Sequence, residues 1–213
     1  MPHNTPVLPD HFRVLPPVAQ ALQMGLPVVA LESAVITHGL PRPHNLNLAR
    51  DVEEEVRSQQ ATPATIALIE GQVHVGLSPE QVEFLADADK TRKISLRDFG
   101  VAIARRESGG TTVAATLHAA HAAGIRVFAT GGIGGVHRGN AFDISADLQE
   151  MSRVPLVIVC AGAKAILDLP ATLEYLETMS VPVVGYDTDE FPAFYSRNSG
   201  LDVSINLETP QEI

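Results

Sequence analysis

Lys164 stands at a position where a purely structural lysine is unexpected. It follows an apolar run at 154–160, typical of a strand buried on both faces, and a small-residue Ala-Gly-Ala turn. Leucine and isoleucine recur at roughly helical spacing after it. The pattern therefore predicts that Lys164 opens a helix, where the positive end of the macrodipole disfavours a cation. Its amine is either a nucleophile or a side chain that extends to water, helped by Asp168 four residues later.

Two further chemical features follow predicted strands. Glu32 comes directly after the apolar run at 26–31, and the glycines at 131, 132, 134 and 135 follow the run at 125–129. Because ligands of open α/β sheets bind beyond the carboxyl ends of the strands, we expect Glu32, the glycine loop and Lys164 to cluster there. The glycines either offer backbone N–H groups to a phosphate or sugar, or form only a tight turn. Their spacing matches neither a dinucleotide fingerprint nor a Walker loop.

A group of oxygen ligands follows the glycine loop. Asp143, Ser145 and Asp147 present two carboxylates and a hydroxyl at alternate positions. Such a set suits magnesium or manganese, with water completing the coordination shell. Alternatively, Ser145 or Asp147 caps the helix that follows. His137 and Arg138, which lie between the glycines and this group, are either site residues or ordinary surface residues.

The composition restricts the class of ligand. The chain has 213 residues, of which 45% are hydrophobic, and a formal net charge of -10. These values describe a globular chain with a substantial core, and they disfavour binding to nucleic acids or membrane surfaces, which requires basic patches. Cys160, the only cysteine, we interpret as a core thiol; no intrachain disulfide is possible. Since the N-terminus also lacks a signal-peptide pattern, we expect a cytoplasmic protein.

The elements that must position these residues alternate between strands and helices. Residues 65–69 and 72–75 form a predicted hairpin through Glu70-Gly71, and Ser78 with Gln81 forms a predicted capping box. The other expected strands are 26–31, 93–95, 125–129, 154–160 and 181–184. The other expected helices are 44–60, 111–123 and the one opened by Lys164. The segment 96–110 is expected to be a polar loop. This order predicts a three-layer α/β/α sandwich with a mainly parallel mixed sheet, as a single domain at 16–213 after an N-terminal arm at 1–15.

Several long blocks carry a specific resemblance. In order, the sequence contains LESAVITHGLP, PATIALIEG, TTVAATLHAA, ATGGIGGVHRG, FDISADLQE and CAGAKAILDL. Together they resemble the pseudouridine-5'-phosphate glycosidase family, from about residue 16 to residue 213. The resemblance implies an α/β/α sandwich that reversibly cleaves the C–C bond between uracil and ribose 5-phosphate in pseudouridine 5'-phosphate. It also implies a homotrimer and a divalent metal, typically manganese.

The resemblance implies roles for individual residues as well. Lys164 would be the nucleophile that forms an imine with C1' of the sugar, Glu32 would be the proton donor, and Asp143 would serve the metal. The positions that match substrate contacts are Lys93, Val113, Ser145, Ala146 and Asp147. His137 and Arg138 receive no firm role from the resemblance.

These residue types suit a C-glycosidic bond. Such a bond has no oxygen or nitrogen leaving group, so protonation of a glycosidic atom does not suffice. An amine that attacks C1' opens the ribose and leads to an iminium, while a carboxylic acid protonates the departing ring oxygen. Because the amine must be uncharged to attack, we expect Lys164 to be kept dry, after a buried strand and beside a positive helix end.

Two alternatives to this activity stay open at the level of the sequence. The same lysine, glutamate and glycine loop would serve a different Schiff-base lyase that acts on a sugar phosphate. The chain could also be an inactive binding or assembly module, because family members continue beyond NLETPQEI with an Asn-Pro-Ile-Pro-like stretch and a later active-site Asn. On this expectation the family's C-terminal segment is missing here, and an apolar face should lie uncovered.

Overall fold

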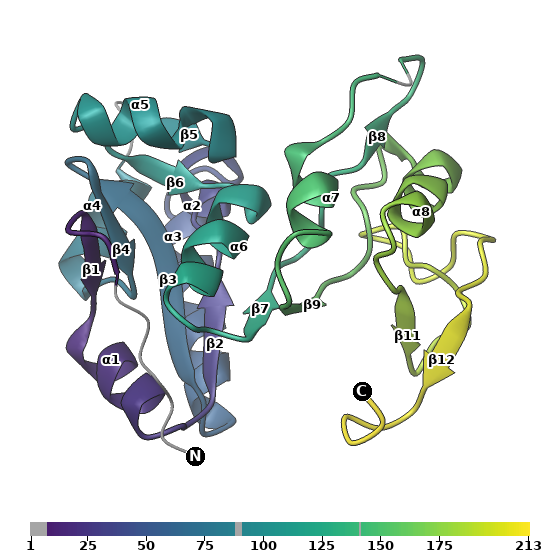
Figure 1. Ribbon diagram of the computed structural model, residues 1–213, viewed down its shortest axis with the longest axis horizontal. Helices are drawn as coiled ribbons and strands as arrows, with labels where there is room; N and C mark the ends of the chain where they lie inside the picture. Colours follow the sequence, from purple (N-terminus) through teal and green to yellow (C-terminus); the bar gives the residue numbers. More distant parts are fainter. Residues whose placement is uncertain (1–7, 88–90, 141) are drawn as a thin grey trace. The chain divides into compact units, whose positions relative to one another are not determined.

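The computed structural model describes residues 8–87, 91–140 and 142–213 (Figure 1). Contacts divide the chain into two compact units: the first comprises Met1–Ala129 and Val154–Ile158, and the second comprises Thr130–Arg153 and Val159–Ile213. The single domain expected over residues 16–213 stays a prediction. Of the expected arm at 1–15, residues 1–7 lie outside the described residues, and Phe12–Val14 form a strand of the main sheet.

Most strands belong to one eight-stranded sheet. Its main path runs through β1 (Phe12–Val14), β4 (Gln72–Val75), β3 (Thr62–Ile69), β2 (Val28–Leu31), β7 (Val127–Ala129) and β9 (Val157–Val159), while β6 (Gly109–Thr111) pairs with β3 and β5 (Arg92–Ile94) pairs with β6. The pairs β1–β4, β2–β3, β2–β7 and β5–β6 are parallel, whereas β3 is antiparallel to β4 and to β6. The expected mainly parallel mixed sheet is therefore confirmed.

Helices cover both faces of this sheet. In Figure 1, α6 (Val113–Ala122) lies in front of the sheet and packs on β2 and β3, while α2 (Ala34–His38) and α3 (His44–Ser58) lie behind it. Together with α4 (Pro79–Ala86), the helices behind share a buried cluster with β3, which includes Ile36, Ala67, Leu77, Val82 and Leu85. The first unit also contains α1 (Pro16–Gln23), the short 3-10 helix η1 (Leu96–Asp98) and α5 (Phe99–Ala104). The three-layer α/β/α arrangement is thus confirmed.

Two local sequence signals produce the expected geometry. Ser78 Oγ accepts the N–H of Gln81 at 3.3 Å, and the N–H of Ser78 donates to Gln81 Oε1 at 2.9 Å, which completes the capping box of α4. Glu70 and Gly71 both adopt positive φ, at 50° and 75°, as a two-residue hairpin turn between β3 and β4 requires. Both predictions are confirmed.

The second unit has short elements joined by long irregular segments. It contains β8 (Val136–His137), α7 (Ala146–Met151), β10 (Leu167–Asp168), α8 (Leu169–Thr178), β11 (Val184–Tyr186) and β12 (Ile205–Leu207). β8 pairs antiparallel with β10, and β11 pairs parallel with β12. Buried side chains in this unit include Ile133, Leu148, Leu167, Leu176 and Phe191. The strand expected at 181–184 shares only Val184 with β11, which is displaced towards the C-terminus beyond Pro182.

The segment at 96–110 is not the polar loop that its composition indicates. It contains η1, α5 and β6, and the turn into η1 is a capping box in which the N–H of Ser95 donates to the Asp98 carboxylate at 3.1 Å. Phe99 and Ala102 are buried, so this short helix is stabilised by packing and not by a long apolar repeat. The prediction was wrong because a six-residue helix is too short to show a period.

Two expectations around Lys164 were also wrong. β9 is an edge strand of the sheet, and Val157 and Val159 are 48% and 57% exposed, so the run at 154–160 is not buried on both faces. Lys164 does not open a helix, because α8 begins at Leu169, after a cap in which Asp168 Oδ1 accepts the N–H of Ala171 at 3.1 Å. Lys164 is exposed and lies in the segment before β10.

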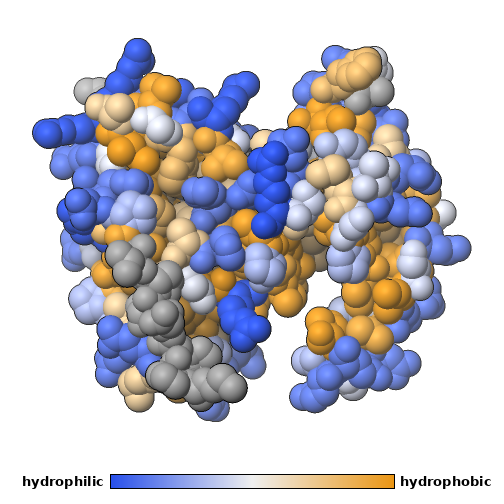
Figure 2. All heavy atoms as spheres, in the orientation of Figure 1, coloured by the Kyte–Doolittle hydropathy of each residue, from blue (hydrophilic) through white to orange (hydrophobic). Residues whose placement is uncertain are grey.

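Apolar side chains reach the surface over part of the second unit. Val184 and Ile205, on β11 and β12, are both exposed, and orange side chains interrupt the polar surface of this region in Figure 2. In residues 8–87, 91–140 and 142–213, every helix is too short or too polar to cross a membrane.

Candidate active site

Glu32 is held at the carboxyl end of β2 by its buried neighbour. Ser33 is fully buried; its Oγ donates to the carbonyl oxygen of Ile66 at 2.5 Å and accepts the N–H of Thr111 at 2.9 Å. These bonds join the end of β2 to β3 and β6. The backbone of the partly buried Glu32 is therefore fixed by hydrogen bonds inside the core, and its position beyond a parallel strand is the one expected for a ligand-facing group.

Lys93 and Val113 lie on neighbouring elements of the same unit. Lys93 is exposed on β5, opposite Gly110 of β6, and Val113 is the first residue of α6. The N–H of Thr112 donates to the carbonyl oxygen of Ile94 at 2.9 Å, which ties the strand of Lys93 to the N-terminus of α6. Because a helix N-terminus and a cation both favour negative charge, this arrangement suits an anionic group.

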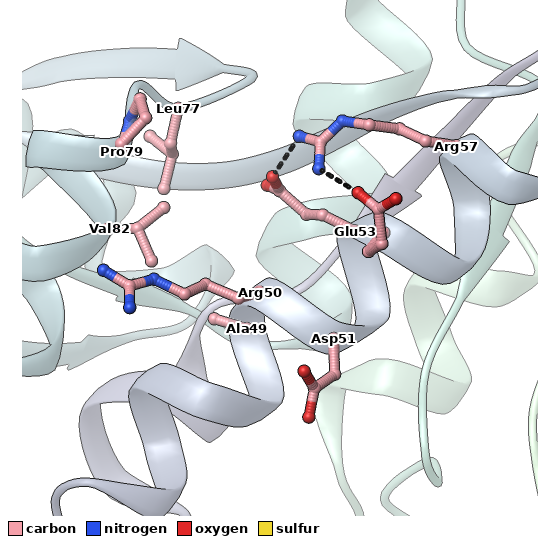
Figure 3. Close-up of a pocket in the computed structure, with 9 residues that line it drawn as sticks. Ala49, Arg50, Asp51, Glu53, Arg57, Leu77, Pro79 and Val82 are labelled. Atoms are coloured by element: carbon pink, nitrogen blue, oxygen red, sulfur yellow. Dashed lines mark hydrogen bonds and ion pairs between the residues drawn. The ribbon is translucent and has the colours of Figure 1, made fainter.

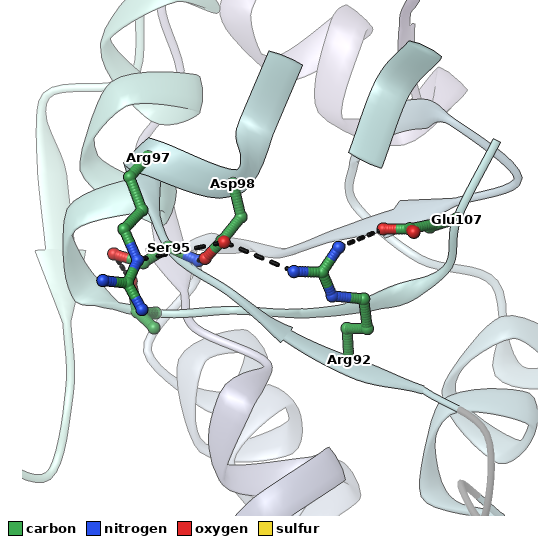
Figure 4. Close-up of polar contacts among 6 residues, drawn as sticks. Arg92, Ser95, Arg97, Asp98 and Glu107 are labelled. Carbon is green, nitrogen blue, oxygen red and sulfur yellow. Dashed lines mark hydrogen bonds and ion pairs between the residues drawn. The ribbon is translucent and has the colours of Figure 1, made fainter. Parts of the chain in front are cut away.

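Arg92, the residue before Lys93, is paired with two carboxylates (Figure 4). The guanidinium of Arg92 donates to Glu107 and, at 3.3 Å, to Asp98. The Glu107 carboxylate, through its hydrogen bond and then its charge, raises the pKa of Arg92. Since side chains alternate across a strand, Lys93 projects to the opposite side of β5 from this ion-pair network.

The segment that carries Lys164 runs along the glycine loop in the second unit. Ala163 forms a bridge with Ile133, and the N–H of Lys164 donates to the carbonyl oxygen of Ile133 at 3.2 Å. The N–H of Leu167 returns to the carbonyl oxygen of Lys164 at 3.0 Å, so residues 164–167 form a turn. The exposed amine of Lys164 therefore belongs to a turn anchored on the glycine loop, and the expected dry helix terminus is corrected.

Ser145 and Asp147 meet the glycine loop from the other side. The N–H of Gly134 donates to Asp147 Oδ2 at 2.9 Å, and the N–H of Ser145 donates to the carbonyl oxygen of Gly135 at 3.0 Å. Ser145 Oγ also accepts the N–H of Asp147 at 3.2 Å and so caps α7. The expected alternative in which Ser145 caps the following helix is therefore confirmed. A Cβ at position 134 would collide with Ser145 Oγ and the Asp147 carboxylate, which explains the glycine there. Ala146, the first residue of α7, is exposed.

Asp143 pairs with His137 near the same loop. His137 Nδ1 lies 3.5 Å from Asp143 Oδ1, and the N–H of His137 donates to the carbonyl oxygen of Asp143 at 2.9 Å. In the part of the chain that the structure describes, no three His, Cys, Asp or Glu side chains converge as a metal-binding group. The exposed Asp143 and His137 fit a divalent ion only as a partial ligand set, in which water and substrate supply the remaining ligands.

Arg138 makes contacts that the sequence did not reveal. Its Nε donates to the carbonyl oxygen of Leu167 at 3.0 Å, and its Nη2 lies 3.3 Å from the carbonyl oxygen of Ala165. Both acceptors belong to the turn that begins at Lys164. No periodic pattern predicts a bond between a loop arginine and a backbone nearly thirty residues later, so only the three-dimensional pairing of β8 with β10 identifies it.

The described structure therefore places the expected residues in two groups. The first-unit group is Glu32, Lys93 and Val113, around the ends of β2, β5 and α6. The second-unit group is Lys164, Asp143, Ser145, Ala146 and Asp147, and the hydrogen bonds described above join Lys164, Ser145 and Asp147 to the glycine loop. Cys160 is half-buried and not a fully buried core thiol; burial raises the pKa of its thiol, which disfavours the reactive thiolate.

A separate hollow on α3 and α4 does not contain these residues. Its volume is about 410 Å³, and its lining includes Arg50, Glu53 and Arg57 (Figure 3). Arg57 lies 2.6 Å from Glu53 and 3.7 Å from Glu54, and Arg50 lies 2.6 Å from Glu83. Because its arginines are engaged in ion pairs, this hollow is a polar surface feature and not an anion-binding candidate.

Known proteins are similar to this chain over most of its length. Residues 17–213 match the family model described as indigoidine synthase A like protein. The chain is 60% identical over 205 residues to the pseudouridine-5'-phosphate glycosidase of Solibacter usitatus, covering 95% of this chain and 69% of that protein. It is 58% identical over 199 residues to the pseudouridine-5'-phosphate glycosidase of Herpetosiphon aurantiacus, covering 92% of this chain and 66% of that protein.

Solved structures agree with this likeness. An indigoidine synthase A-like protein from Thermotoga maritima has a TM-score of 0.83 at 40% identity, over 87% of this chain and 63% of its own. The prealnumycin C-glycosynthase AlnA in complex with ribulose 5-phosphate has a TM-score of 0.87 at 42% identity, over 94% of this chain and 66% of its own. This chain spans between 63% and 69% of the length of these four proteins.

Proposed function

Because the chain belongs to the indigoidine synthase A-like family, with pseudouridine-5'-phosphate glycosidases among its relatives, we propose that it cleaves pseudouridine 5'-phosphate reversibly to uracil and ribose 5-phosphate. The family expected from the sequence motifs is thereby confirmed. The observation that carries the proposal is the anchoring of Lys164 beside the glycine loop and Asp147, since these groups come from three separate sequence blocks.

The chemistry assigned to Lys164 is imine formation. Its uncharged amine attacks C1' of the ribose, the bond from C1' to the ring oxygen breaks, and that oxygen takes a proton from Glu32. The ammonium formed by this attack returns a proton to the Glu32 carboxylate, and the nitrogen lone pair then forms the C1'=N bond as the C1'–C bond to uracil breaks. The electron pair of the broken bond leaves on the uracil carbon, which takes the proton held by Glu32. Water adds to the iminium to give a carbinolamine. The C1'–N bond of this carbinolamine then breaks, which releases ribose 5-phosphate and restores the amine of Lys164.

The remaining residues have binding roles in this proposal. The exposed cation of Lys93 and the N-terminus of α6 at Val113 favour the phosphate, because both attract negative charge. Ser145 and Asp147, with the adjoining Ala146, would contact the substrate. The bound ribulose 5-phosphate of AlnA, a relative at 42% identity, supports a sugar-phosphate ligand of this class.

We also propose that Asp143 helps to hold a divalent metal, manganese in the first instance. Its exposed carboxylate, with His137 nearby, leaves room for the water-rich shell that such ions favour. The metal would supply positive charge beside the phosphorylated substrate. Asp143→Asn should weaken manganese binding at least tenfold in a calorimetric titration, whereas Asp51→Asn, an exposed carboxylate on α3, should leave it unchanged. Equal affinities in both variants would remove Asp143 from the metal site.

Two further properties complete the proposal. A homotrimer is proposed from the family resemblance, and the exposed apolar residues of β11 and β12 offer surface that an assembly could cover. Analytical ultracentrifugation tests this directly, and a monomer or dimer at all concentrations would contradict it. The proposed location is the cytoplasm, where a phosphorylated nucleoside would be found.

Reductive trapping tests the proposed function. The chain is incubated with ribose 5-phosphate and borohydride, and the modified peptide is mapped by mass spectrometry. An adduct on Lys164, lost in Lys164→Ala, is expected; an adduct elsewhere, or none in a folded sample, contradicts the proposal. Release of uracil from pseudouridine 5'-phosphate then separates this activity from another Schiff-base sugar-phosphate lyase, which would be trapped by the sugar but would release no uracil.

A further inference from the structure

The turn that presents Lys164 is not fixed by burial. Lys164, Ala165 and Ile166 are all exposed, with Ile166 at 74%. On either side, Ala163 and Leu167 are almost fully buried, so the turn is a short exposed excursion between two anchored residues. Its conformation must therefore depend on hydrogen bonds to its backbone, because few apolar contacts constrain it.

Arg138 supplies hydrogen bonds to the carbonyl groups of this turn. Within the turn, the carbonyl of Lys164 accepts the N–H of Leu167 at 3.0 Å. The carbonyls of Ala165 and Leu167 accept from Nη2 and Nε of Arg138, at 3.3 Å and 3.0 Å. The guanidinium thus spans the turn from outside, with two donors held in one rigid plane.

We propose that Arg138 is a positioning residue for Lys164: its forked guanidinium fixes the turn and thereby the direction of the attacking amine. The inference rests on the proposed function of Lys164. A nucleophile on an exposed turn samples many orientations unless the backbone beneath it is rigid, and an error of about 1 Å at a reacting atom can cost roughly a hundredfold in rate. Arginine suits this role because its two donors lie at a fixed separation, which a lysine cannot reproduce.

Direct binding of the substrate phosphate by Arg138 is the main competing role. The side chain also lines a shallow hollow of about 300 Å³ in the second unit, together with Asp168 and Ser199. Two arguments favour the positioning role: two of the guanidinium nitrogens already donate to backbone carbonyls, and the carboxylate of Asp168 would repel an anion in that hollow. The two roles predict different dependence on the phosphate group.

The test compares Arg138→Met, Arg138→Lys and Arg13→Met in single-turnover borohydride trapping. Arg13 is the matched control, because its Nη1 also donates to two backbone carbonyls, of Asp10 and Phe12, but in β1 and the loop before it. Trapping rates and half-saturating concentrations are measured with ribose 5-phosphate and with unphosphorylated ribose. Thermal midpoints and amide hydrogen exchange at residues 163–168 are recorded for the same samples.

If Arg138 positions Lys164, Arg138→Met should trap both sugars about tenfold to a hundredfold more slowly, with unchanged half-saturation and faster exchange at 163–168. Arg138→Lys should recover part of the rate, since one carbonyl regains a donor, and Arg13→Met should match the wild type. A weaker affinity for ribose 5-phosphate with an unchanged rate for ribose would assign Arg138 to the phosphate and overturn the inference. So would an unchanged rate in Arg138→Met.

Failure of the proposed function has a distinct signature. If the wild type itself gives no adduct at Lys164, the imine chemistry is wrong and the positioning role falls with it. If the wild type is trapped at Lys164 while Arg138→Met behaves identically, only the role of Arg138 is contradicted. A general loss of folding in Arg138→Met would appear as a lowered thermal midpoint and as faster exchange throughout the second unit. In that case Arg138→Lys decides: if it is folded normally and traps both sugars at the wild-type rate, the inference is also overturned.

Discussion

In the first unit, Glu32, Lys93 and Val113 are held by a buried sheet, whereas in the second unit Lys164, Ser145 and Asp147 are held mainly by hydrogen bonds between irregular segments. Ser33, directly after Glu32, is fully buried and bonded to two other strands. Lys164, by contrast, lies on an exposed turn fixed by Ile133 and Arg138. Loosening the buried support of the first group should therefore cost mainly stability, whereas loosening the support of the second should cost activity as well as stability.

The largest expected effect is on Glu32, the proposed acid. Glu32→Gln retains the shape of the side chain but cannot donate a proton in the same way, so uracil release should fall by roughly 10²–10⁴-fold while ribose 5-phosphate is still trapped on Lys164. Pre-steady-state uracil release and peptide mapping measure the two steps on the same sample. Asp51→Asn, on the exposed side of α3, is the control and should match the wild type. Unchanged uracil release would remove Glu32 from the mechanism.

Gly134→Ala tests the tightness of the second group. The added methyl would collide with Ser145 Oγ and the Asp147 carboxylate, and both must move away from the glycine loop. Trapping should slow about tenfold to a hundredfold, with a loss of stability of roughly 1–3 kcal/mol from overpacking. Gly100→Ala is the control, since nothing lies within 4 Å of its added Cβ in α5, where alanine also favours the helix. Full activity in Gly134→Ala would show that this loop tolerates a shift that the proposed geometry does not allow.

The contrast between the groups also explains what the sequence could predict. Around Glu32, the apolar run of β2, the β3–β4 hairpin and the capping box at Ser78 are local signals, and each produced the expected element. Around Lys164, the decisive contacts join Ile133 to Ala163 and Arg138 to Leu167, which no period records. The pattern after Lys164 did contain a helix, but its true start was marked by the cap Asp168 and the following Leu169-Pro170.

Residue types were predicted better than their environments. The sequence led us to expect Glu32, the glycine loop and Lys164 to cluster, and in the second unit hydrogen bonds join the glycine loop to Lys164 and to Asp147. The same reasoning placed the lysine in a dry site, and it is exposed. Burial depends on which segments pack over a residue, so a sequence run that resembles a buried strand, such as that of β9, does not determine it.

Ser33→Ala should show the opposite balance in the first group. The change removes the acceptor of the buried Thr111 N–H, while Thr111 Oγ1 still donates to Ile66 at 2.6 Å, so one donor is left unsatisfied. The expected cost is about 1–3 kcal/mol of unfolding free energy, measured by urea denaturation. Ser58→Ala, whose exposed hydroxyl donates to the carbonyl of Glu55, should change stability by less than about 0.5 kcal/mol. An equal loss of unfolding free energy in the two variants would contradict the proposal that the buried hydrogen bonds of Ser33 support Glu32.

The smallest expected effect concerns pH and again distinguishes the two units. Burial, and secondarily the charge of Arg13, lowers the pKa of His74 on β4 from its ordinary value of 6.5, and its Nδ1 lies 3.0 Å from Gln81 Nε2. Above 6.5 the histidine is neutral in both folded and unfolded chains, so it changes nothing. As the pH falls below 6.5, the unfolded chain binds the proton first, so stability is lost until the folded pKa is passed.

His74→Gln should remove part of this acid sensitivity, and Arg13→Met should reduce it by less, because burial is the larger cause. Amide hydrogen exchange at pH 5 and pH 7.5 locates the effect. At pH 5, β1 and β4 of His74→Gln should be better protected than in the wild type, while protection of the second unit should not change. An equal change in both units would show that their stabilities are not separable in this way.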